Sequence, residues 1–86
     1  MKRAFDDTGW EDYLLWQQTD RAVLRKINEL IRDCLRDPRA GLGKPEKLKG
    51  NYRGAWSRRI TNEYRLVYRI EGEWLVVAQC RFHYTE

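Results

Sequence analysis

The sequence predicts an α+β fold in which two consecutive helices pack on one face of a mostly antiparallel sheet. Three observations predict this fold class. The chain has 86 residues, the size of a single small domain. Two segments with helical apolar spacing follow each other near its start, and three strand-like apolar segments fill its second half. The expected element order is β-α-α-β-β-β, in one domain that spans residues 1–86.

The first expected elements are a short strand and a helix. The strand is "KRAF" at residues 2–5, and the helix is expected from Thr8, which forms a T-x-x-E capping box with Glu11. Large aromatic side chains must supply much of the core in a chain of this size. The aromatic residues that we expect in the core are Trp10, Tyr13, Trp16 and Trp56.

A second helix is expected immediately after the first. Thr19 or Asp20 can cap it, and apolar side chains then recur at helical spacing from Val23 to Cys34. The helix must end by residue 37, because Pro38 disfavours helical backbone in the residue before it.

The second half of the chain begins with an expected long loop, "PRAGLGKPEKLKGN" at 38–51, followed by strands at 55–60, 64–70 and 74–84. A strand places alternate side chains on opposite faces. In the last strand, strict alternation groups Val76, Ala78, Cys80 and Phe82 on one face and Gln79, Arg81 and His83 on the other, polar face.

The positive charge of the chain is concentrated in residues 44–69. The whole chain carries a net charge of +4, whereas this block holds eight basic and two acidic side chains. Tyr52, Trp56, Tyr64 and Tyr68 are interleaved with those charges. Basic residues with interleaved aromatic rings are typical of surfaces that neutralise phosphates and stack bases. Solvated charges on a sheet face remain an alternative interpretation.

Several classes of protein are disfavoured by composition. The longest apolar run is "WLVVA", far shorter than the about 18 residues of a membrane span, and the N-terminus does not resemble a signal peptide. Cys34 and Cys80 lie in apolar segments, which favours reduced core thiols. His, Cys and carboxylates are too sparse for a metal site. We therefore expect a cytoplasmic protein without a metal or another cofactor.

A specific chemistry is suggested by Glu46, an acid among lysines in the loop, and by His83, the single histidine of the chain. Metal-free RNA cleavage needs a base that accepts the proton of the ribose 2′-OH and an acid that protonates the leaving 5′-oxygen. It also needs cations that stabilise the crowded phosphorane. Carboxylate, imidazole and guanidinium groups can fill these roles.

The order and spacing of several blocks carry a resemblance to a known family. The chain contains "WEDYLLWQQTD", "KINELIRD", "GLGKPEKLKGN", "GAWSRRIT", "YRLVYRI" and "CRFHY", and in this it resembles the YoeB toxins, mRNA interferases of the RelE superfamily. The resemblance implies a RelE-like fold and metal-free, cofactor-free cleavage of mRNA in the ribosomal A site. It also implies neutralisation by a YefM-type antitoxin and possible homodimers.

The same resemblance implies roles for individual residues. Glu46 matches the general base, Arg65 the cation at the transition state, and His83 the general acid; Tyr84 matches an aromatic residue that assists at the scissile phosphate. Lys49 and Arg59 match basic residues that contact or stabilise the phosphate, and Lys44 and Arg58 of the basic block are also expected to bind RNA or phosphate.

Other interpretations remain open at this point. Glu46 can form a surface ion pair with Lys44 or Lys47, and Arg65 can be a solvated strand charge. At the level of the whole protein, one alternative is a ParE-like toxin that poisons gyrase, and another is a non-catalytic nucleic-acid-binding module. An acidic antitoxin tail is expected to fold onto the basic face and to displace or distort the catalytic end; the alternative is an antitoxin that binds elsewhere and only blocks access to the ribosome.

Overall fold

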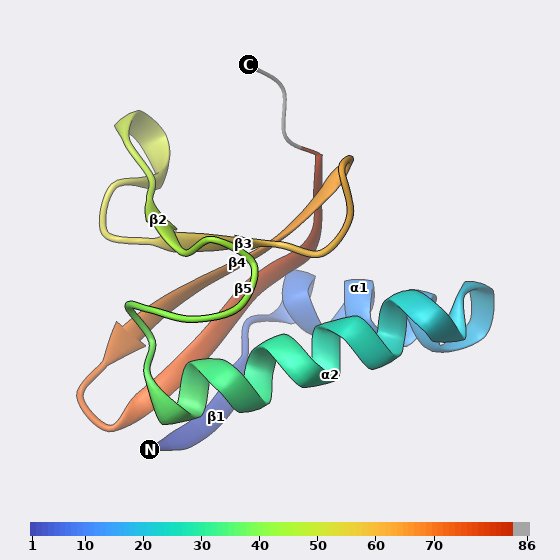
Figure 1. Cartoon of the computed structure of the whole chain (residues 1–86), viewed down its shortest axis with the longest axis horizontal. Coiled ribbons are helices and arrows are strands. Elements are labelled where there is room, and N and C mark those ends of the chain that lie inside the picture. The colour runs from blue at the N-terminus through green and yellow to red at the C-terminus, as the bar shows by residue number, and fades with distance from the viewer. Residues whose placement is uncertain (84–86) are drawn as a thin grey trace.

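The computed structural model describes residues 1–83, in which two helices cover one face of a five-stranded sheet (Figure 1). The described elements are β1 (Lys2–Phe5), α1 (Asp7–Thr19), α2 (Arg21–Arg36), β2 (Glu46–Lys47), the 3-10 helix η1 (Gly50–Tyr52), β3 (Trp56–Arg59), β4 (Tyr64–Glu71) and β5 (Trp74–His83). The strand order is β1-β5-β4-β3-β2, with β1 parallel to β5 and the other neighbours antiparallel. The predicted fold class is confirmed, with one strand added.

The added strand is β2, which lies inside the segment that the sequence predicts to be a loop. Glu46 pairs with Ser57 of β3, and the N–H of Leu48 continues this pairing by donating to the carbonyl of Ala55 at 2.9 Å. A strand of two residues is too short to leave a periodic pattern, so sequence reasoning missed it. As a result, the backbone of Glu46 is fixed at the edge of the sheet.

The predicted capping box of Thr8 and Glu11 at the start of α1 is wrong. The helix begins at Asp7, so that Thr8 and Glu11 both lie inside it. Its N-cap residue is Asp6, and the Asp6 carboxylate is used elsewhere: it accepts hydrogen bonds from Arg69 Nη1 at 2.5 Å and Nη2 at 3.0 Å. These hydrogen bonds lower the pKa of Asp6. The cap residue therefore ties β1 and α1 to β4.

The second helix begins and ends where the sequence predicts. The carboxylate of Asp20 accepts hydrogen bonds from the N–H groups of Ala22 and Val23, at 3.1 and 3.2 Å. The last helical residue is Arg36, and Asp37 is the C-cap. Neither α2 nor any other helix within residues 1–83 has the length and apolar character needed to cross a membrane.

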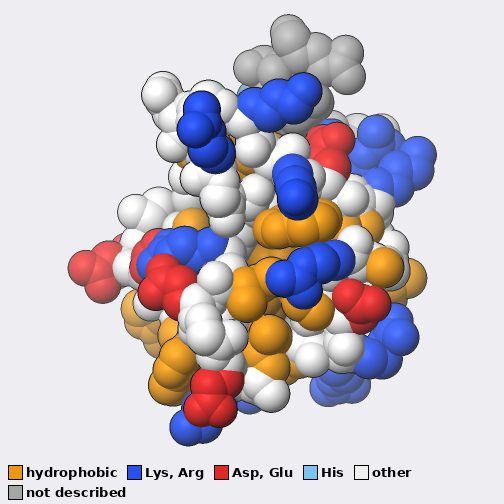
Figure 2. All heavy atoms as spheres, turned by 90° about the vertical axis from the view of Figure 1, so that its left-hand side faces the viewer, with side chains coloured by type: hydrophobic (Ala, Val, Ile, Leu, Met, Phe, Trp, Pro, Cys, Tyr) orange, Lys and Arg blue, Asp and Glu red, His pale blue; other side chains and the backbone are white. Residues whose placement is uncertain are grey.

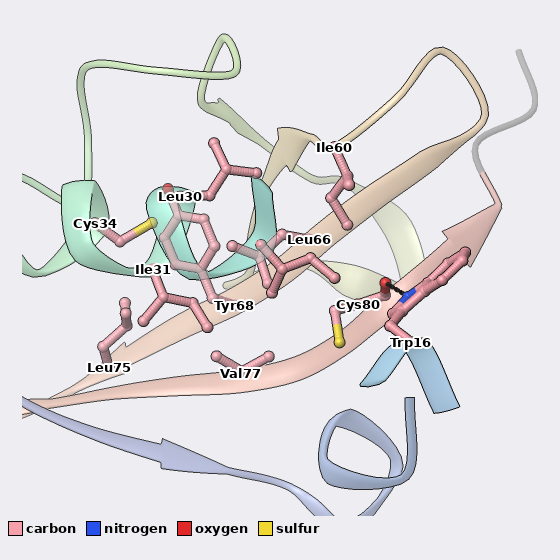
Figure 3. Packing of buried hydrophobic residues seen from close by; sticks show 11 residues of the cluster. Trp16, Leu30, Ile31, Cys34, Ile60, Leu66, Tyr68, Leu75, Val77 and Cys80 are labelled. Atoms are coloured by element: carbon pink, nitrogen blue, oxygen red, sulfur yellow. Dashed lines mark hydrogen bonds between the residues drawn. The ribbon is translucent and has the colours of Figure 1, made fainter. Parts of the chain in front are cut away.

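The core lies between the helices and the sheet (Figure 3). Its buried members are Trp16, Ile27, Leu30, Ile31, Cys34, Ile60, Leu66, Tyr68, Leu75, Val77 and Cys80. The indole N–H of Trp16 donates to the carbonyl of Cys80 at 2.8 Å, which satisfies the polar atom of a buried ring. Both cysteines are free and buried, as predicted, and burial raises the pKa of Cys34 to about 11 and that of Cys80 to about 12.

The four aromatic residues that were predicted to lie in the core differ in burial. Trp16 is buried, while Tyr13 and Trp56 pack half-buried against the core. Trp10 is 46% exposed, so its predicted core position is wrong. Its ring stacks on Tyr13 with centroids 5.8 Å apart and meets Phe5 edge-on at 5.4 Å, at the rim of the helical layer.

The predicted alternation along β5 is also wrong, because the register against β4 shifts at two places. Val77 and Cys80 both lie in the core although they are three positions apart, and Cys80 does not share a face with Val76. Bulges leave backbone N–H groups outside the ladder. The carboxylate of Asp12 accepts hydrogen bonds from the backbone N–H groups of Cys80 and Arg81, with N···O distances of 3.0 and 3.2 Å. An α1 side chain thus stabilises the irregular part of β5.

Candidate functional site

The centre of the candidate site is an ion pair between β2 and β4. Arg65 Nη1 lies 3.4 Å from Glu46 Oε1, which is long for a charged hydrogen bond. The Glu46 side chain is 51% exposed, whereas the Arg65 side chain is 6% exposed. Glu46 therefore meets a strand arginine, while the flanking Lys47 lies over the ring of Trp56 at 5.8 Å. The Arg65 side chain is thus almost completely buried on β4, whereas the Glu46 carboxylate is accessible to solvent.

The register of the sheet places a second arginine beside this pair. Arg59 of β3 lies directly opposite Arg65 of β4, and Arg65 in turn lies opposite Phe82 of β5. Residues directly opposite in a sheet are close, and two like charges in such a position repel each other. The arrangement therefore creates a positive potential that favours an anion at this point of the sheet.

Arg58, the neighbour of Arg59, has a different environment from the predicted one. Its side chain is fully buried, and all five of its N–H donors are used. Nε donates to the hydroxyl of Tyr68 at 3.1 Å, and one N–H of Nη1 donates to Asp33 at 2.6 Å. The other three donate to main-chain carbonyls that follow α2, at Asp37, Ala40 and Leu42.

This network fastens the segment after α2 to the sheet. The Tyr68 hydroxyl donates to the carbonyl of Pro38 at 2.6 Å. Gly41 has a φ of 124°, and a Cβ there would lie 2.1 Å from Asp33 Oδ2. Hydrogen bonds from Arg36, from the N–H of Leu42 and from the buried guanidinium hold the pKa of Asp33 well below its ordinary range.

The predicted phosphate-binding role of Arg58 is therefore corrected. A guanidinium with no exposed surface and five occupied donors has nothing left to offer a phosphate. Its role is to hold the chain segment that leads from α2 into β2, where Glu46 lies. Asp33, the partner that sequence reasoning missed, has no local sequence signal, because it is 25 residues away from the arginine.

The remaining predicted phosphate-binding residues, Lys44, Lys49 and Arg59, are all exposed. Lys44 has a positive φ of 52°, and the N–H of Arg59 donates to the carbonyl of Gly43 at 2.7 Å, so the loop is attached to β3 immediately before the lysine. Figure 2 shows Lys and Arg side chains over the upper part of one face, the level at which β2 and η1 lie in Figure 1. Lys44 and Lys49 lie within two residues of β2, and Arg59 belongs to the neighbouring β3, so these exposed cations lie around the β2 edge of the sheet.

His83 lies at the end of β5, directly opposite Tyr64. Its Nε2 is 3.5 Å from Glu63 Oε2, and its ring meets the Tyr64 ring edge-on at 5.9 Å. Adjacent strand residues point to opposite faces, so His83 shares the face of Tyr64 and not that of Arg65. The structure brings Glu46 and Arg65 together and places the imidazole one register position away. Tyr84 lies outside the described residues.

A separate groove of about 500 Å³ lies between β1, α1 and α2. Its lining includes the aromatic side chains of Phe5, Trp10 and Tyr13, together with Arg3 and Arg32. β1 and β2 are the two opposite edges of the sheet. The groove therefore does not belong to the candidate site around Glu46.

Comparison with known proteins places this arrangement in a family. Residues 5–84 match the family described as "YoeB-like toxin of bacterial type II toxin-antitoxin system". The chain belongs to this YoeB family. The predicted resemblance is thereby confirmed, and the matched range contains all four residues to which it assigns catalytic roles.

Individual YoeB proteins are similar over almost the full chain. Toxin YoeB of Escherichia coli K12 is 54% identical over 84 residues, covering 98% of this chain and 100% of that protein. A solved structure titled "YoeB/ParE toxin from Agrobacterium tumefaciens" superposes with a TM-score of 0.93 at 56% identity, with 98% and 100% coverage. YoeB from Staphylococcus aureus, solved in complex with YefM and as a dimer, gives TM-scores of 0.89 and 0.90 at 41% and 42% identity, with 98% coverage of both chains.

Proposed function

We propose that this YoeB-family toxin is a ribosome-dependent endoribonuclease that acts in the cytoplasm, cuts mRNA in the ribosomal A site and thereby stops translation. The observation that carries the proposal is the arrangement of Arg59, Arg65 and Glu46, in which two arginines lie directly opposite each other beside an exposed carboxylate. A phosphate between the guanidinium groups relieves their repulsion, and the carboxylate is then next to the ribose that bears this phosphate.

The proposed reaction uses the ribose 2′-OH as the nucleophile. Glu46 accepts the 2′-OH proton while the oxygen attacks the adjacent phosphorus, and Arg65 stabilises the charge that develops on the phosphorane. His83 donates a proton to the departing 5′-oxygen, which leaves a 2′,3′-cyclic phosphate on one fragment and a 5′-OH on the other. Tyr84 assists at the scissile phosphate. No protein nucleophile is required.

Two local changes must accompany substrate binding in this mechanism. The phosphate competes with Glu46 for Arg65, so the ion pair opens and the carboxylate becomes free to accept a proton. The pair is long at 3.4 Å, and the Glu46 side chain, 51% exposed, can be solvated by water, so opening it costs little once the phosphate replaces the carboxylate at the buried arginine. His83 must leave Glu63 and swing round the end of β5, from the face of Tyr64 to the face of Arg65, a movement open to an imidazole that is 56% exposed at a strand end.

The exposed cations give the protein its affinity for RNA. Lys44, Lys49 and Arg59 contact phosphates of the mRNA and of the ribosomal A site in this proposal. Each phosphate that a cation neutralises releases counterions, so binding must weaken as the salt concentration rises.

The proposed partner besides the ribosome is a YefM-type antitoxin, on the basis of the Staphylococcus aureus relative that was solved with YefM. An acidic tail that folds onto the basic β2 edge would cover Glu46 and Arg65. A second copy of the chain is a further candidate partner, because the same relative was solved as a dimer.

Primer extension on a defined mRNA, with and without ribosomes, tests the proposed function. The Glu46→Gln variant is expected to bind ribosomes and to lose cleavage by about 10² to 10⁴-fold, the usual value of a general base. Glu73→Gln is the matched control, because Glu73 is also an exposed glutamate but lies in the β4–β5 turn, away from the site. Full cleavage by Glu46→Gln contradicts the base assignment. Intact mRNA together with accumulated gyrase–DNA cleavage complexes would favour the ParE-like alternative.

A further inference from the structure

The aromatic side chains of the basic block are sorted by the fold into buried and accessible ones. Tyr68 is fully buried, Tyr64 packs half-buried against Trp16 at 5.2 Å, and Trp56 is half-buried beneath Lys47. Tyr52 is the exception, with 41% of its surface exposed. Of the four interleaved rings, this one alone is broadly open to solvent.

Tyr52 is linked to the proposed cleavage site through one side chain. Its ring meets Phe82 edge-on, with centroids 5.1 Å apart and planes at 75°. Phe82 lies directly opposite Arg65, which contacts Glu46. Because the contact between the two rings is edge-to-face, it leaves ring surface open for a flat ligand.

The Tyr52 ring is also held in place by its backbone. η1 follows β2 after two residues, and the N–H of Tyr52 donates to the carbonyl of Lys49 at 3.3 Å, while its own carbonyl accepts the N–H of Ala55 at 3.0 Å. Gly50 and Gly54, on either side, adopt positive φ angles of 64° and 95°, which closes the turn. An ordered backbone reduces the entropy lost when a ligand stacks on the ring.

Positive charge accompanies the ring. Lys49 and Arg53 lie three residues before and one residue after Tyr52, both are exposed, and within residues 1–83 neither has an ion-pair partner. A stacking ring with flanking cations is how proteins bind single-stranded nucleic acid without reading base edges. The ring can hold a base, and the cations can hold the phosphates on either side of it.

We propose that Tyr52, supported by Phe82, forms a base-stacking subsite that receives an unpaired mRNA nucleobase beside the scissile phosphate. This inference rests on the proposed function and adds a substrate contact to it. In-line attack by a 2′-OH requires that neighbouring bases leave their regular stack, and a ring that receives one of them favours that geometry. The subsite is expected to tolerate all four bases, because every base offers a flat face.

The test compares Tyr52→Leu, Tyr52→Phe and Trp74→Leu in single-turnover cleavage of ribosome-bound mRNA. Trp74 is the matched control, because it is 43% exposed and lies beneath Lys2, but at the far end of β5. Tyr52→Leu is expected to raise the half-saturating toxin concentration at least fivefold, the lower end of the usual effect of removing a base-stacking ring. Tyr52→Phe and Trp74→Leu are expected to match the unaltered protein, and thermal unfolding checks that all variants fold.

A second arm uses mRNAs that carry one abasic site at successive positions of the A-site codon. At one position, the abasic site is expected to raise the half-saturating concentration of the unaltered protein as much as Tyr52→Leu does on intact mRNA. On that same abasic mRNA, the half-saturating concentration of Tyr52→Leu is expected to rise no further. The subsite is overturned if Tyr52→Leu and the unaltered protein have equal half-saturating concentrations on intact mRNA. It is also overturned if the effects of Tyr52→Leu and of the abasic site add at every position. If the unaltered protein cleaves no mRNA, the proposed function fails. Binding of a labelled single-stranded oligoribonucleotide by the unaltered protein and Tyr52→Leu then decides the subsite separately.

Discussion

Removal of the buried guanidinium of Arg58 is expected to destabilise the fold strongly. The Arg58→Leu variant keeps most of the buried volume but deletes five hydrogen bonds, one of them to the carboxylate of Asp33. Breaking a buried ion pair from one side costs about 3 to 5 kcal/mol. Asp33 keeps Arg36 and the N–H of Leu42 as partners. We therefore expect the lower end of that range, a loss of about 3 kcal/mol in the free energy of unfolding.

Urea denaturation followed by tryptophan fluorescence measures this loss. Arg36→Ala is the matched control, because it removes the other arginine from Asp33 but takes away a side chain that is 71% exposed. That control is expected to cost about 0 to 1 kcal/mol. Arg58→Lys keeps the charge but offers three donors in place of five. Its loss in the free energy of unfolding should lie between those of Arg58→Leu and Arg36→Ala. A loss below about 1 kcal/mol in Arg58→Leu would refute the account of the loop attachment.

Three further outcomes follow from packing and ionisation. Gly9→Ala should unfold more easily, because a Cβ would lie 2.4 Å from the carbonyl oxygen of Val77; an unchanged melting temperature would contradict this close approach. Because the pKa of Asp33 is lowered in the folded state, its contribution is complete above an ordinary aspartate pKa of about 3.8 and is lost as the pH falls below it, so acid titration of Asp33→Asn should show a weaker loss of stability. Cys34 and Cys80 should resist thiol reagents at pH 8 until the protein unfolds, since burial raises their pKa values to about 11 and about 12.

The parts of the fold that the sequence predicted correctly are those with local signals. α2 has both an apolar stripe and a capping aspartate, and each is sufficient to place it. β4 has β-branched and aromatic residues and is bounded by turn residues. The parts that were wrong or missed depend on distant partners. The start of α1 differs because Arg69 of β4 binds the carboxylate of Asp6, and the bulges of β5 persist because Asp12 of α1 accepts their N–H groups.

In the candidate site, too, some residues were predicted correctly and one was not. The resemblance pointed to Glu46 and Arg65, and the structure places them in contact. The prediction of phosphate-binding residues in the basic block also grouped Arg58 with Arg59, although neighbouring strand residues point to opposite faces. The period-two pattern contains a signal that could have separated them, because Arg58 shares its strand face with Trp56 and Ile60. The partners that make its burial favourable lie on another strand, on α2 and in the loop, where no short-range pattern reveals them.

The most direct test of the central claim replaces a single ribose in the mRNA. A ribosome-bound message that carries a 2′-deoxynucleotide immediately 5′ of the scissile phosphate lacks the proposed nucleophile but keeps the base and the phosphate. The account predicts that this message binds the toxin normally and is not cut at that position, whereas the all-ribose message yields a 2′,3′-cyclic phosphate and a 5′-OH. Cleavage of the deoxy-substituted message at an undiminished rate would contradict the 2′-OH mechanism, and with it the roles proposed for Glu46 and His83.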